Sequence, residues 1–363
     1  MNEVGRFYKT PDGTAGSHLG LRWKGRVRYI VPRERAGQKA CWKLFHPGRL
    51  EFPLRAQARL AHLLGAIACE ENERLAFIRA SVGNEVGLSC LRSGAPGPWS
   101  KDTILFLDGH HQPLYFVKAG TGEAVNSLLR NEAKWLRTLR EHPPLAGHIS
   151  EAVSQRCCVD LSYVAVRALS GRIEFEFTDA HSDFLHKLHA YSRQNLRLQE
   201  SNLYRNLRSR QTDLNGLLDD AWSRRLDKAL RLIEESFSDR AELFVAAHND
   251  FTPWNIRIDQ GIARIFDWEY ADYEQLPLFD PLHFALMPMA LEKRSTSCIV
   301  NCMHATLGKC PEWLGRECCH HDQTQALAYA LNLSTLYLTA EQGKPGADFV
   351  LESYSRLIDT FFH

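Results

Sequence analysis

The sequence predicts an α+β protein in which a β-rich part precedes a mainly helical part. Between residues 80 and 170, short apolar runs are separated by Gly, Pro and Asp-Gly turn signals, a pattern typical of strands. One long amphipathic pattern over residues 122–141 interrupts these runs, and helical periodicity dominates after residue 171. The chain has 363 residues and 44% hydrophobic residues, which is enough for a core in each of two parts.

Composition excludes several functional classes. The formal net charge is +1, so no global field favours nucleic acid, and we expect no nucleic-acid partner. No apolar stretch approaches the length of a membrane span, and the N-terminal MNEVGRFYKT lacks the apolar core of a signal peptide. We therefore expect a cytoplasmic protein whose ten cysteines are reduced thiols rather than a disulfide framework. Nothing in the sequence indicates an oligomeric state.

Residues 1–75 are expected to form an N-terminal extension of unclear role. Residues 22–31 alternate basic and apolar residues, as a half-exposed strand does, and residues 54–64 predict a short amphipathic helix. Eight Lys or Arg residues and one acid lie between Arg22 and Lys43. This charge indicates either a solvated strand face or a docking surface for an anionic partner.

The β-rich part is expected over residues 76–170. Strands are predicted at residues 86–91, 103–107, 114–119 and 161–169, with a Gly/Pro loop at 93–98 and an Asp-Gly turn at 108–109. Lys118 near the end of the third strand either snorkels out of the sheet or binds an anion. The predicted helix at 122–141 carries Glu132 close to its apolar face, where a carboxylate needs a cation, and Lys118 is the candidate.

The helical part is expected over residues 171–363. Helices are predicted at residues 183–193, 214–237, 323–338 and 349–362. Between them, a buried strand at 243–247 precedes a loop and a hairpin formed by residues 255–258 and 263–266. The loop carries His248, Asp250 and Asn255, and Asp267 follows the hairpin. This order brings Asp250, Asn255 and Asp267 together at one end of the small sheet.

These motifs resemble the aminoglycoside phosphotransferase/choline kinase superfamily, small-molecule relatives of the protein kinases. The resemblance rests on His248–Asn255 (H-x-D-x-x-x-x-N) and on Phe266–Tyr270 (FDWEY), with Lys118 and Glu132 matching the small-lobe lysine and glutamate. It covers roughly residue 82 to the C-terminus and implies a protein-kinase-like bilobal fold. The loop SGAPGPWS departs from the G-x-G-x-x-G of protein kinases, and residues 1–75 have no counterpart.

The resemblance implies a kinase that uses ATP and Mg²⁺ to phosphorylate an alcohol group. Asp250 would be the catalytic residue that accepts or orients the acceptor hydroxyl. Asn255 and Asp267 would bind the metal, because Mg²⁺ takes hard oxygen ligands. The residues expected to bind the nucleotide phosphates are Lys118, held by Glu132, and the backbone N–H groups around Ser93, Gly94 and Gly97.

Three further features have two interpretations each. His248 is expected to brace the catalytic loop rather than to touch the acceptor. Glu269 supports either metal or acceptor binding, or a structural salt bridge. The Cys- and His-rich segment 298–321 is either a zinc site or a set of incidental thiols, and it contains no C-x-x-C pair.

The acceptor stays open between three small-molecule classes. Acids and aromatic residues surround the motif and suit a cationic acceptor such as choline, ethanolamine or an aminoglycoside; they are Glu269, Asp272, Glu274, Trp254, Trp268, Tyr270 and Tyr273. The TPWN and DWEYA motifs also resemble bacterial phosphotransferases of surface-polysaccharide synthesis, which implies a sugar hydroxyl. The alternatives are a catalytically weak pseudokinase-like nucleotide-binding module and a protein kinase, although H-R-D, D-F-G and A-P-E are missing.

Overall fold

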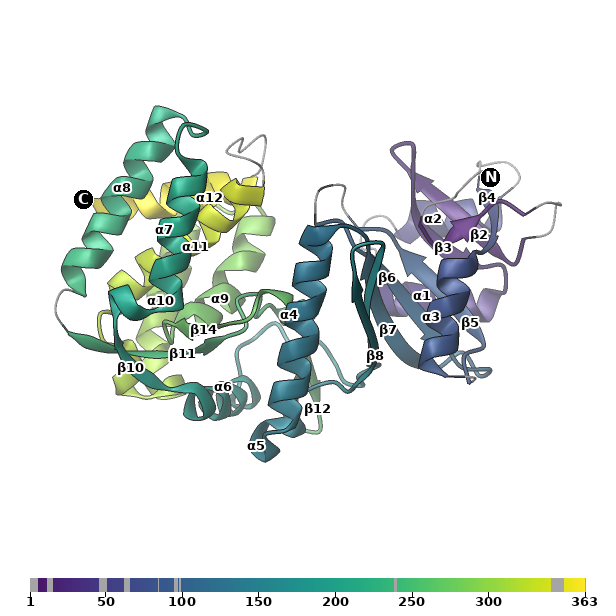
Figure 1. Ribbon diagram of the computed structural model, residues 1–363, viewed down its shortest axis with the longest axis horizontal. Helices are drawn as coiled ribbons and strands as arrows, with labels where there is room; N and C mark the ends of the chain where they lie inside the picture. Colours follow the sequence, from purple (N-terminus) through teal and green to yellow (C-terminus); the bar gives the residue numbers. More distant parts are fainter. Residues whose placement is uncertain are drawn as a thin grey trace. The chain divides into compact units, whose positions relative to one another are not determined.

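The computed structural model describes residues 6–11, 16–45, 51–61, 66–83, 85–94, 97, 99–237, 240–340 and 349–362. The chain divides into two compact units (Figure 1). The first unit comprises residues 1–137 and 150–169, and the second comprises residues 138–149 and 170–363. Among the described residues, no helix is both long enough and apolar enough to cross a membrane.

The first unit is built on a nine-stranded antiparallel sheet. In spatial order its strands are β1 (Tyr8–Lys9), β4 (Ile67–Glu71), β2 (His18–Trp23), β3 (Arg26–Pro32), β5 (Leu88–Arg92), β6 (Asp102–Leu107), β7 (Pro113–Gly120), β9 (Leu161–Arg167) and β8 (Ala152–Cys158). The predicted strands at 103–107, 114–119 and 161–169 are confirmed. Strands from the first 75 residues belong to the same sheet as the later strands, so the expected extension is continuous with the β-rich part.

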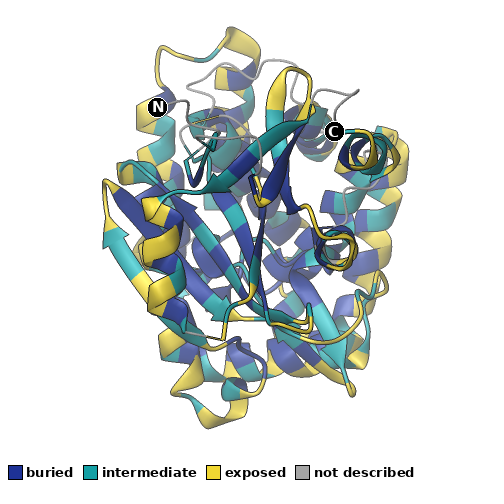
Figure 2. Ribbon diagram, turned by 90° about the vertical axis from the view of Figure 1, so that its right-hand side faces the viewer, coloured by how far each residue is buried: buried dark blue, intermediate teal, exposed yellow. Residues whose placement is uncertain are grey.

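Both faces of this sheet are buried under helices. Strand β6 shows the alternation, because Ile104 and Phe106 point into one hydrophobic cluster while Leu105 and Leu107 point into another. Helix α3 (Glu73–Val82) belongs to the first cluster, and α1 (Arg35–Phe45) and α2 (Glu51–Arg59) belong to the second. The helix predicted at 122–141 is α4 (Glu123–Arg140). Figure 2 shows the inner parts of the strands as largely buried.

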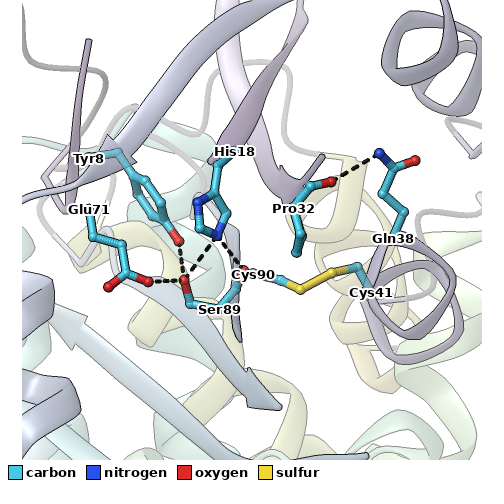
Figure 3. The surroundings of a disulfide bond; sticks show 8 residues. All are labelled: Tyr8, His18, Pro32, Gln38, Cys41, Glu71, Ser89 and Cys90. Atoms are coloured by element: carbon cyan, nitrogen blue, oxygen red, sulfur yellow. Dashed lines mark hydrogen bonds between the residues drawn. A yellow bond between two sulfur atoms is a disulfide. The ribbon is translucent and has the colours of Figure 1, made fainter. Parts of the chain in front are cut away.

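Two sequence-based expectations about the first 90 residues are wrong. The single strand expected at residues 22–31 is a hairpin, because Lys24 and Gly25 turn the chain at positive φ between β2 and β3. Cys41 and Cys90 form a disulfide, although all cysteines were expected to be reduced (Figure 3). Helix α1 packs on the sheet face to which Cys90 points, which brings together two residues that are 49 positions apart.

A polar cluster lies within the first unit near this disulfide (Figure 3). Ser89 Oγ accepts a hydrogen bond from the Tyr8 hydroxyl at 2.8 Å and donates one to Glu71. His18 Nε2 lies 3.0 Å from the Ser89 carbonyl oxygen, and Arg79 pairs with Glu71. Tyr8, His18 and Ser89 are at most 3% exposed, so this Ser/His/Glu arrangement joins β1, β2, β4 and β5 internally and is closed to substrate.

The second unit is mainly helical. Its helices are α5 (Pro143–Ala146), α6 (Asp179–Ser192), α7 (Asn202–Leu214), α8 (Asp220–Ser236), α9 (Phe279–Leu291), α10 (Thr296–Leu314), α11 (Asp322–Ala340) and α12 (Phe349–Asp359). Strands β10 (Gln194–Arg197), β11 (Ala241–Ala247) and β14 (Asp272–Gln275) form a small sheet, and β12 (Ile256–Asp259) pairs with β13 (Ile262–Ile265). The predicted strand and hairpin around the H-x-D-x-x-x-x-N motif are therefore confirmed. Helix α11 packs against α7, α8, α9 and α12.

Candidate active site

The loop after β11 is anchored by Asp280 at the start of α9. Its Oδ2 accepts the backbone N–H of His248 at 2.8 Å, and its Oδ1 accepts that of Asn249 at 3.0 Å. Asn249 has φ of +62°, so the carboxylate holds the chain in a left-handed turn that a non-glycine residue adopts only with support. Burial raises the pKa of Asp280 to about 6, against the lowering effect of the two N–H groups.

His248 ties this loop to the segment before Asp267. Its Nδ1 accepts the backbone N–H of Asp250 at 3.2 Å, and its Nε2 donates to the carbonyl oxygen of Phe266 at 3.1 Å. The side chain is fully buried, and this burial lowers its pKa to about 4. The imidazole is therefore neutral at pH 7, with its proton on Nε2, and acts as a brace.

Asp250 is held by one donor on each carboxylate oxygen. Asn255 Nδ2 donates to Oδ2 at 2.8 Å, and His283 Nε2 lies 3.2 Å from Oδ1. The Asp250 side chain is 27% exposed, whereas that of His283 is 3% exposed. Each oxygen has a further lone pair, so the carboxylate is fixed in direction and still open to a ligand.

Asn255 has its amide orientation fixed by Asp250. Its Nδ2 donates to both the carboxylate Oδ2 and the backbone oxygen of Asp250, at 2.8 and 3.0 Å. Because both partners are acceptors, the amide nitrogen must face them, and Oδ1 is the atom left for another group. The site thus presents an oxygen of the type that Mg²⁺ prefers.

Asp267 follows β13 in a conformation unusual for a non-glycine residue. Its φ and ψ are +74° and +53°, in the left-handed region. The next residue, Trp268, is fully buried and donates from Nε1 to the Ile265 carbonyl oxygen at 3.3 Å, which holds the turn. Glu269 is also buried, at 7% exposure. Such strained backbone costs about 1–3 kcal/mol and is concentrated at functional sites.

In the first unit, Lys118 on β7 pairs with Glu132 on α4. The Nζ atom lies 3.1 and 3.0 Å from the two carboxylate oxygens. Their side chains are 18% and 3% exposed, so the charge of Glu132 is compensated out of water. The structure therefore brings together the two residues that the sequence pairs.

In the Gly/Pro loop at residues 93–98, the backbone N–H groups of Ser93 and Gly94 bond within the protein, whereas a phosphate-binding loop leaves such groups for its ligand. The Ser93 N–H donates to the Arg28 carbonyl oxygen at 2.9 Å, and the Gly94 N–H donates to Asp102 Oδ1 at 3.3 Å. A Cβ atom on Gly94 would lie 2.1 Å from the Lys101 carbonyl oxygen, so the glycine allows this close approach. Gly97 is exposed, and Ala95, Pro96 and Pro98 lie outside the described residues. Neither of the first two N–H groups is left for a phosphate in this conformation.

Three residues behind Asp250 were missed by the sequence analysis. His283 Nδ1 lies 3.1 Å from the hydroxyl of Tyr329, which in turn lies 2.7 Å from the hydroxyl of Tyr354. All three side chains are buried. The sequence carries one signal for this hydrogen-bonded series, because His283 and Asp280 are the only charged or titratable residues in the apolar run that becomes α9.

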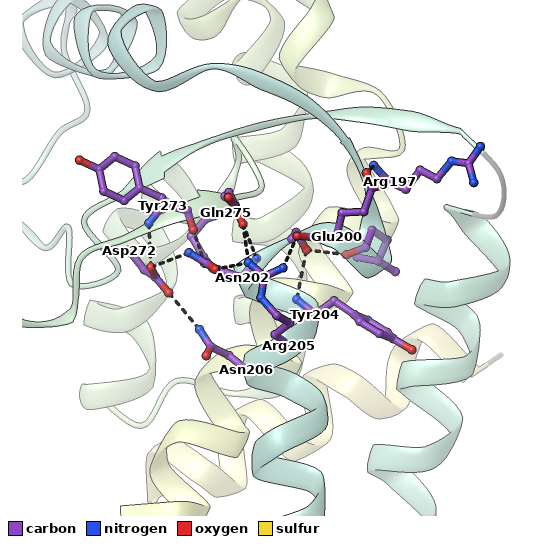
Figure 4. Close-up of polar contacts among 12 residues, drawn as sticks. Arg197, Glu200, Asn202, Tyr204, Arg205, Asn206, Asp272, Tyr273 and Gln275 are labelled. Atoms are coloured by element: carbon purple, nitrogen blue, oxygen red, sulfur yellow. Dashed lines mark hydrogen bonds and ion pairs between the residues drawn. The ribbon is translucent and has the colours of Figure 1, made fainter.

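The acids and aromatic residues expected around the acceptor are partly used inside the protein (Figure 4). Asp272 accepts hydrogen bonds from Asn202 Nδ2, Asn206 Nδ2 and the Tyr273 N–H, at 3.2, 2.9 and 2.8 Å. Glu274 accepts the Asn202 N–H at 2.7 Å and pairs with Arg205 at 3.1 Å. Trp268 is fully buried. Among the described residues, the cysteines and histidines of 298–321 do not come together as three metal ligands.

The fold and the loop geometry are those of a kinase-like phosphotransferase. Residues 93–288 match the model of the phosphotransferase enzyme family, which is more than half of the chain. The chain belongs to this family, and the predictions of the superfamily, of a phosphotransferase enzyme and of a protein-kinase-like α+β fold are confirmed. A comparison with curated proteins finds no significant match.

Solved structures of aminoglycoside phosphotransferases share the fold. The apo form of a thermostable mutant of APH(4)-Ia has 13% identity and a TM-score of 0.52, covering 79% of this chain and 98% of that chain. A related mutant in ternary complex with ADP and hygromycin B has 12% identity and a TM-score of 0.51, covering 78% of this chain and 97% of that chain. At such identities the similarity establishes the fold.

Proposed function

We propose that this protein transfers the γ-phosphate of ATP to a hydroxyl group of a small molecule or sugar, with Mg²⁺ as the metal. The observation that carries the proposal is the Asp250 carboxylate, held by Asn255 on one oxygen and His283 on the other, in a chain of the phosphotransferase family. The ADP in the complex of APH(4)-Ia with hygromycin B supports a nucleotide as donor.

The donor atoms present fit a hard divalent cation. Asn255 Oδ1 and the Asp267 carboxylate are the proposed ligands, and both are oxygen donors of the kind that Mg²⁺ takes. Bound Mg²⁺ would neutralise phosphate charge during transfer. In the first unit, we assign Lys118 to the nucleotide phosphates as a point charge, with Glu132 fixing its position.

Asp250 is the proposed catalytic residue. Its carboxylate accepts the proton of the acceptor hydroxyl as the oxygen attacks phosphorus, or orients that hydroxyl before the proton leaves. Such a group contributes about 10²–10⁴-fold to rate. Asn255 and His283 keep the open lone pairs in one direction, which matters because phosphoryl transfer depends mainly on positioning.

The deciding experiment measures phosphate transfer from Mg·ATP to a panel of acceptors, with Asp250→Asn as control. The panel contains choline, ethanolamine, an aminoglycoside and neutral and acidic monosaccharides. We expect at least one acceptor to raise ADP release well above the background of the variant. If no acceptor does so, the pseudokinase-like module is the better assignment. Phosphorylation of a general protein substrate instead would favour the protein kinase.

A further inference from the structure

A cavity within the second unit lies beside the candidate base. Asn249, Tyr270 and His283 line one side of it, and His283 Nε2 is 3.2 Å from Asp250 Oδ1. Arg210 of α7, Asp272 of β14 and Asn332 of α11 also line it. A molecule bound there lies next to His283, one of the two residues that hold Asp250, so the chemistry of this lining bears on the acceptor.

Arg210 lines this cavity, and only part of its guanidinium is hydrogen-bonded by described residues. Its Nη1 donates to the backbone oxygen and to Oδ1 of Asn332, at 3.2 and 2.8 Å. No described residue accepts a hydrogen bond from its Nε or Nη2, and no described carboxylate lies within ion-pair distance. The Nε–Nη2 edge is the fork that binds a carboxylate or phosphate through two parallel hydrogen bonds.

Asp272 and Glu274 use their carboxylate oxygens within the protein. Asp272 is the acid whose charge acts on Arg210, but its oxygens accept three hydrogen bonds from Asn202, Asn206 and the Tyr273 N–H (Figure 4). Glu274 is paired with Arg205. Arg210 is therefore the charged side chain of this lining that keeps unused hydrogen-bond donors, and burial is the largest cause of the lowering of its pKa. A guanidinium taken out of water without a partner is costly unless a ligand compensates it.

We propose that Arg210 binds an anionic group, a carboxylate or a phosphate, on the acceptor whose hydroxyl is presented to Asp250. This inference rests on the proposed function and specifies its acceptor class. It replaces the cationic acceptor suggested by the sequence, because two of the acids that favoured one, Asp272 and Glu274, are bonded internally. A purely cationic molecule would place a second positive charge beside a guanidinium that has no described carboxylate at ion-pair distance.

The test compares acceptors that differ in one anionic group. Calorimetric titrations use the full chain with Mg²⁺ and a non-hydrolysable ATP analogue. The probes are ethylene glycol against glycolate, and D-glucose against D-glucuronate and D-glucose 6-phosphate, with choline as the cation. We expect at least one anionic member to bind about tenfold or more tightly than its neutral partner. Glycolate and D-glucuronate test a carboxylate as the anionic group, and D-glucose 6-phosphate tests a phosphate.

Variants assign the preference to Arg210. Arg210→Gln keeps a donor for Asn332 but removes the charge and the fork, so the anion preference is lost. Arg210→Lys keeps the charge without the fork and retains part of the preference. Arg205→Gln on the same helix is the matched control, because Arg205 pairs with Glu274 and does not line the cavity. We expect the Arg205→Gln variant to prefer anionic over neutral acceptors as strongly as the wild type does. Thermal unfolding confirms that each variant is folded.

The inference is overturned if no pair shows a preference for the anion, or if Arg210→Gln retains the preference. Phosphate transfer to the same panel separates this failure from failure of the proposed function. Transfer to neutral or cationic members without an anion preference leaves the phosphotransferase assignment standing and removes the role of Arg210. If anions bind in a way that depends on Arg210 but no member of the panel is phosphorylated, the role of Arg210 stands and the phosphotransferase assignment is removed.

Discussion

His283 Nε2 lies 3.2 Å from Asp250 Oδ1, and the far side of the same imidazole meets the buried hydroxyl of Tyr329. The tyrosine fixes the ring, and the ring fixes one oxygen of the carboxylate. His283 is therefore a positioning residue in our account rather than a group that touches the acceptor.

Replacing His283 with leucine removes the donor on Oδ1 and leaves the Asp250 carboxylate held by Asn255 on Oδ2 alone. We expect kcat to fall about 10–100-fold, because small errors in position have large costs in transfer reactions. The KM for ATP stays near the wild-type value. Steady-state kinetics with the best acceptor of the panel measure both constants.

His283→Gln provides the control for that variant, since its carboxamide nitrogen can donate to Oδ1 and should restore part of kcat. A purely structural role predicts that glutamine and leucine lower activity only in proportion to lost folded protein. Equal kcat in wild type and His283→Leu would contradict the positioning role.

Asp267 allows a direct test of the metal assignment. We expect Asp267→Ala to weaken binding of Mg·ATP about tenfold or more, because a hard oxygen ligand is lost. Binding of ATP without Mg²⁺ should change little. Calorimetric titrations with and without Mg²⁺ distinguish the two. Unchanged Mg·ATP affinity would remove Asp267 from the metal site, and a matched loss of both affinities would indicate damage to the fold.

The sequence predicts the parts of the site that are local or follow adjacent elements. Asp250 and Asn255 lie five positions apart in one turn, and Lys118 and Glu132 lie on a strand and the helix that follows it. His283 and Arg210 were not found, because their partners Asp250 and Asn332 are 33 and 122 positions away. Spacing along the chain carries no information about such contacts.

The same limit explains three features of the fold that the sequence did not predict, namely the β2–β3 turn, strand β8 and the disulfide. The β2–β3 turn at Lys24-Gly25 lies inside a continuous basic and apolar alternation, which hides the break between strands. Strand β8 at the end of the sheet order has one neighbour in the sheet and no fully buried residue, so it lacks the apolar pattern of a central strand. The disulfide between Cys41 and Cys90 depends on how α1 packs, which composition does not show.

Acid should destabilise the protein through buried neutral histidines. Burial lowers the pKa of His248 to about 4 and that of His189 to about 3, from 6.5. Between about pH 4 and 6.5 the unfolded chain binds more protons at these two residues than the folded chain does. The contribution of these two histidines to the free energy of unfolding is complete above pH 6.5. It is lost as the pH falls, by up to about 1.4 kcal/mol per pH unit for each histidine.

Asp280 acts in the opposite direction over part of this range. Its folded pKa of about 6 means that the folded chain holds a proton that the unfolded chain releases, so its contribution to stability grows as the pH falls from about 6 to about 4. Burial also lowers the pKa of His18, His148 and His181 and raises that of Asp102 and Asp272, so five histidines oppose three carboxyl groups. Urea unfolding between pH 7.5 and 5 should show falling stability, and His189→Leu should reduce the slope. A slope that His189→Leu leaves unchanged would contradict this account.

The polar cluster around Ser89 predicts a role for the first 75 residues. Ser89→Ala removes the hydroxyl that accepts from Tyr8 and donates to Glu71, and leaves the buried Tyr8 hydroxyl and the half-buried Glu71 carboxylate without that partner. We expect the free energy of unfolding to fall by about 1–3 kcal/mol.

Tyr8→Phe removes the same contact from the other side, so the double variant should lose less than the sum of the single losses. Urea unfolding of the four proteins gives the coupling energy, which is about 0.5–3 kcal/mol for residues in one network. Additive losses would mean that Tyr8 and Ser89 act independently, and β1 would then be attached to the sheet mainly through its pairing with β4.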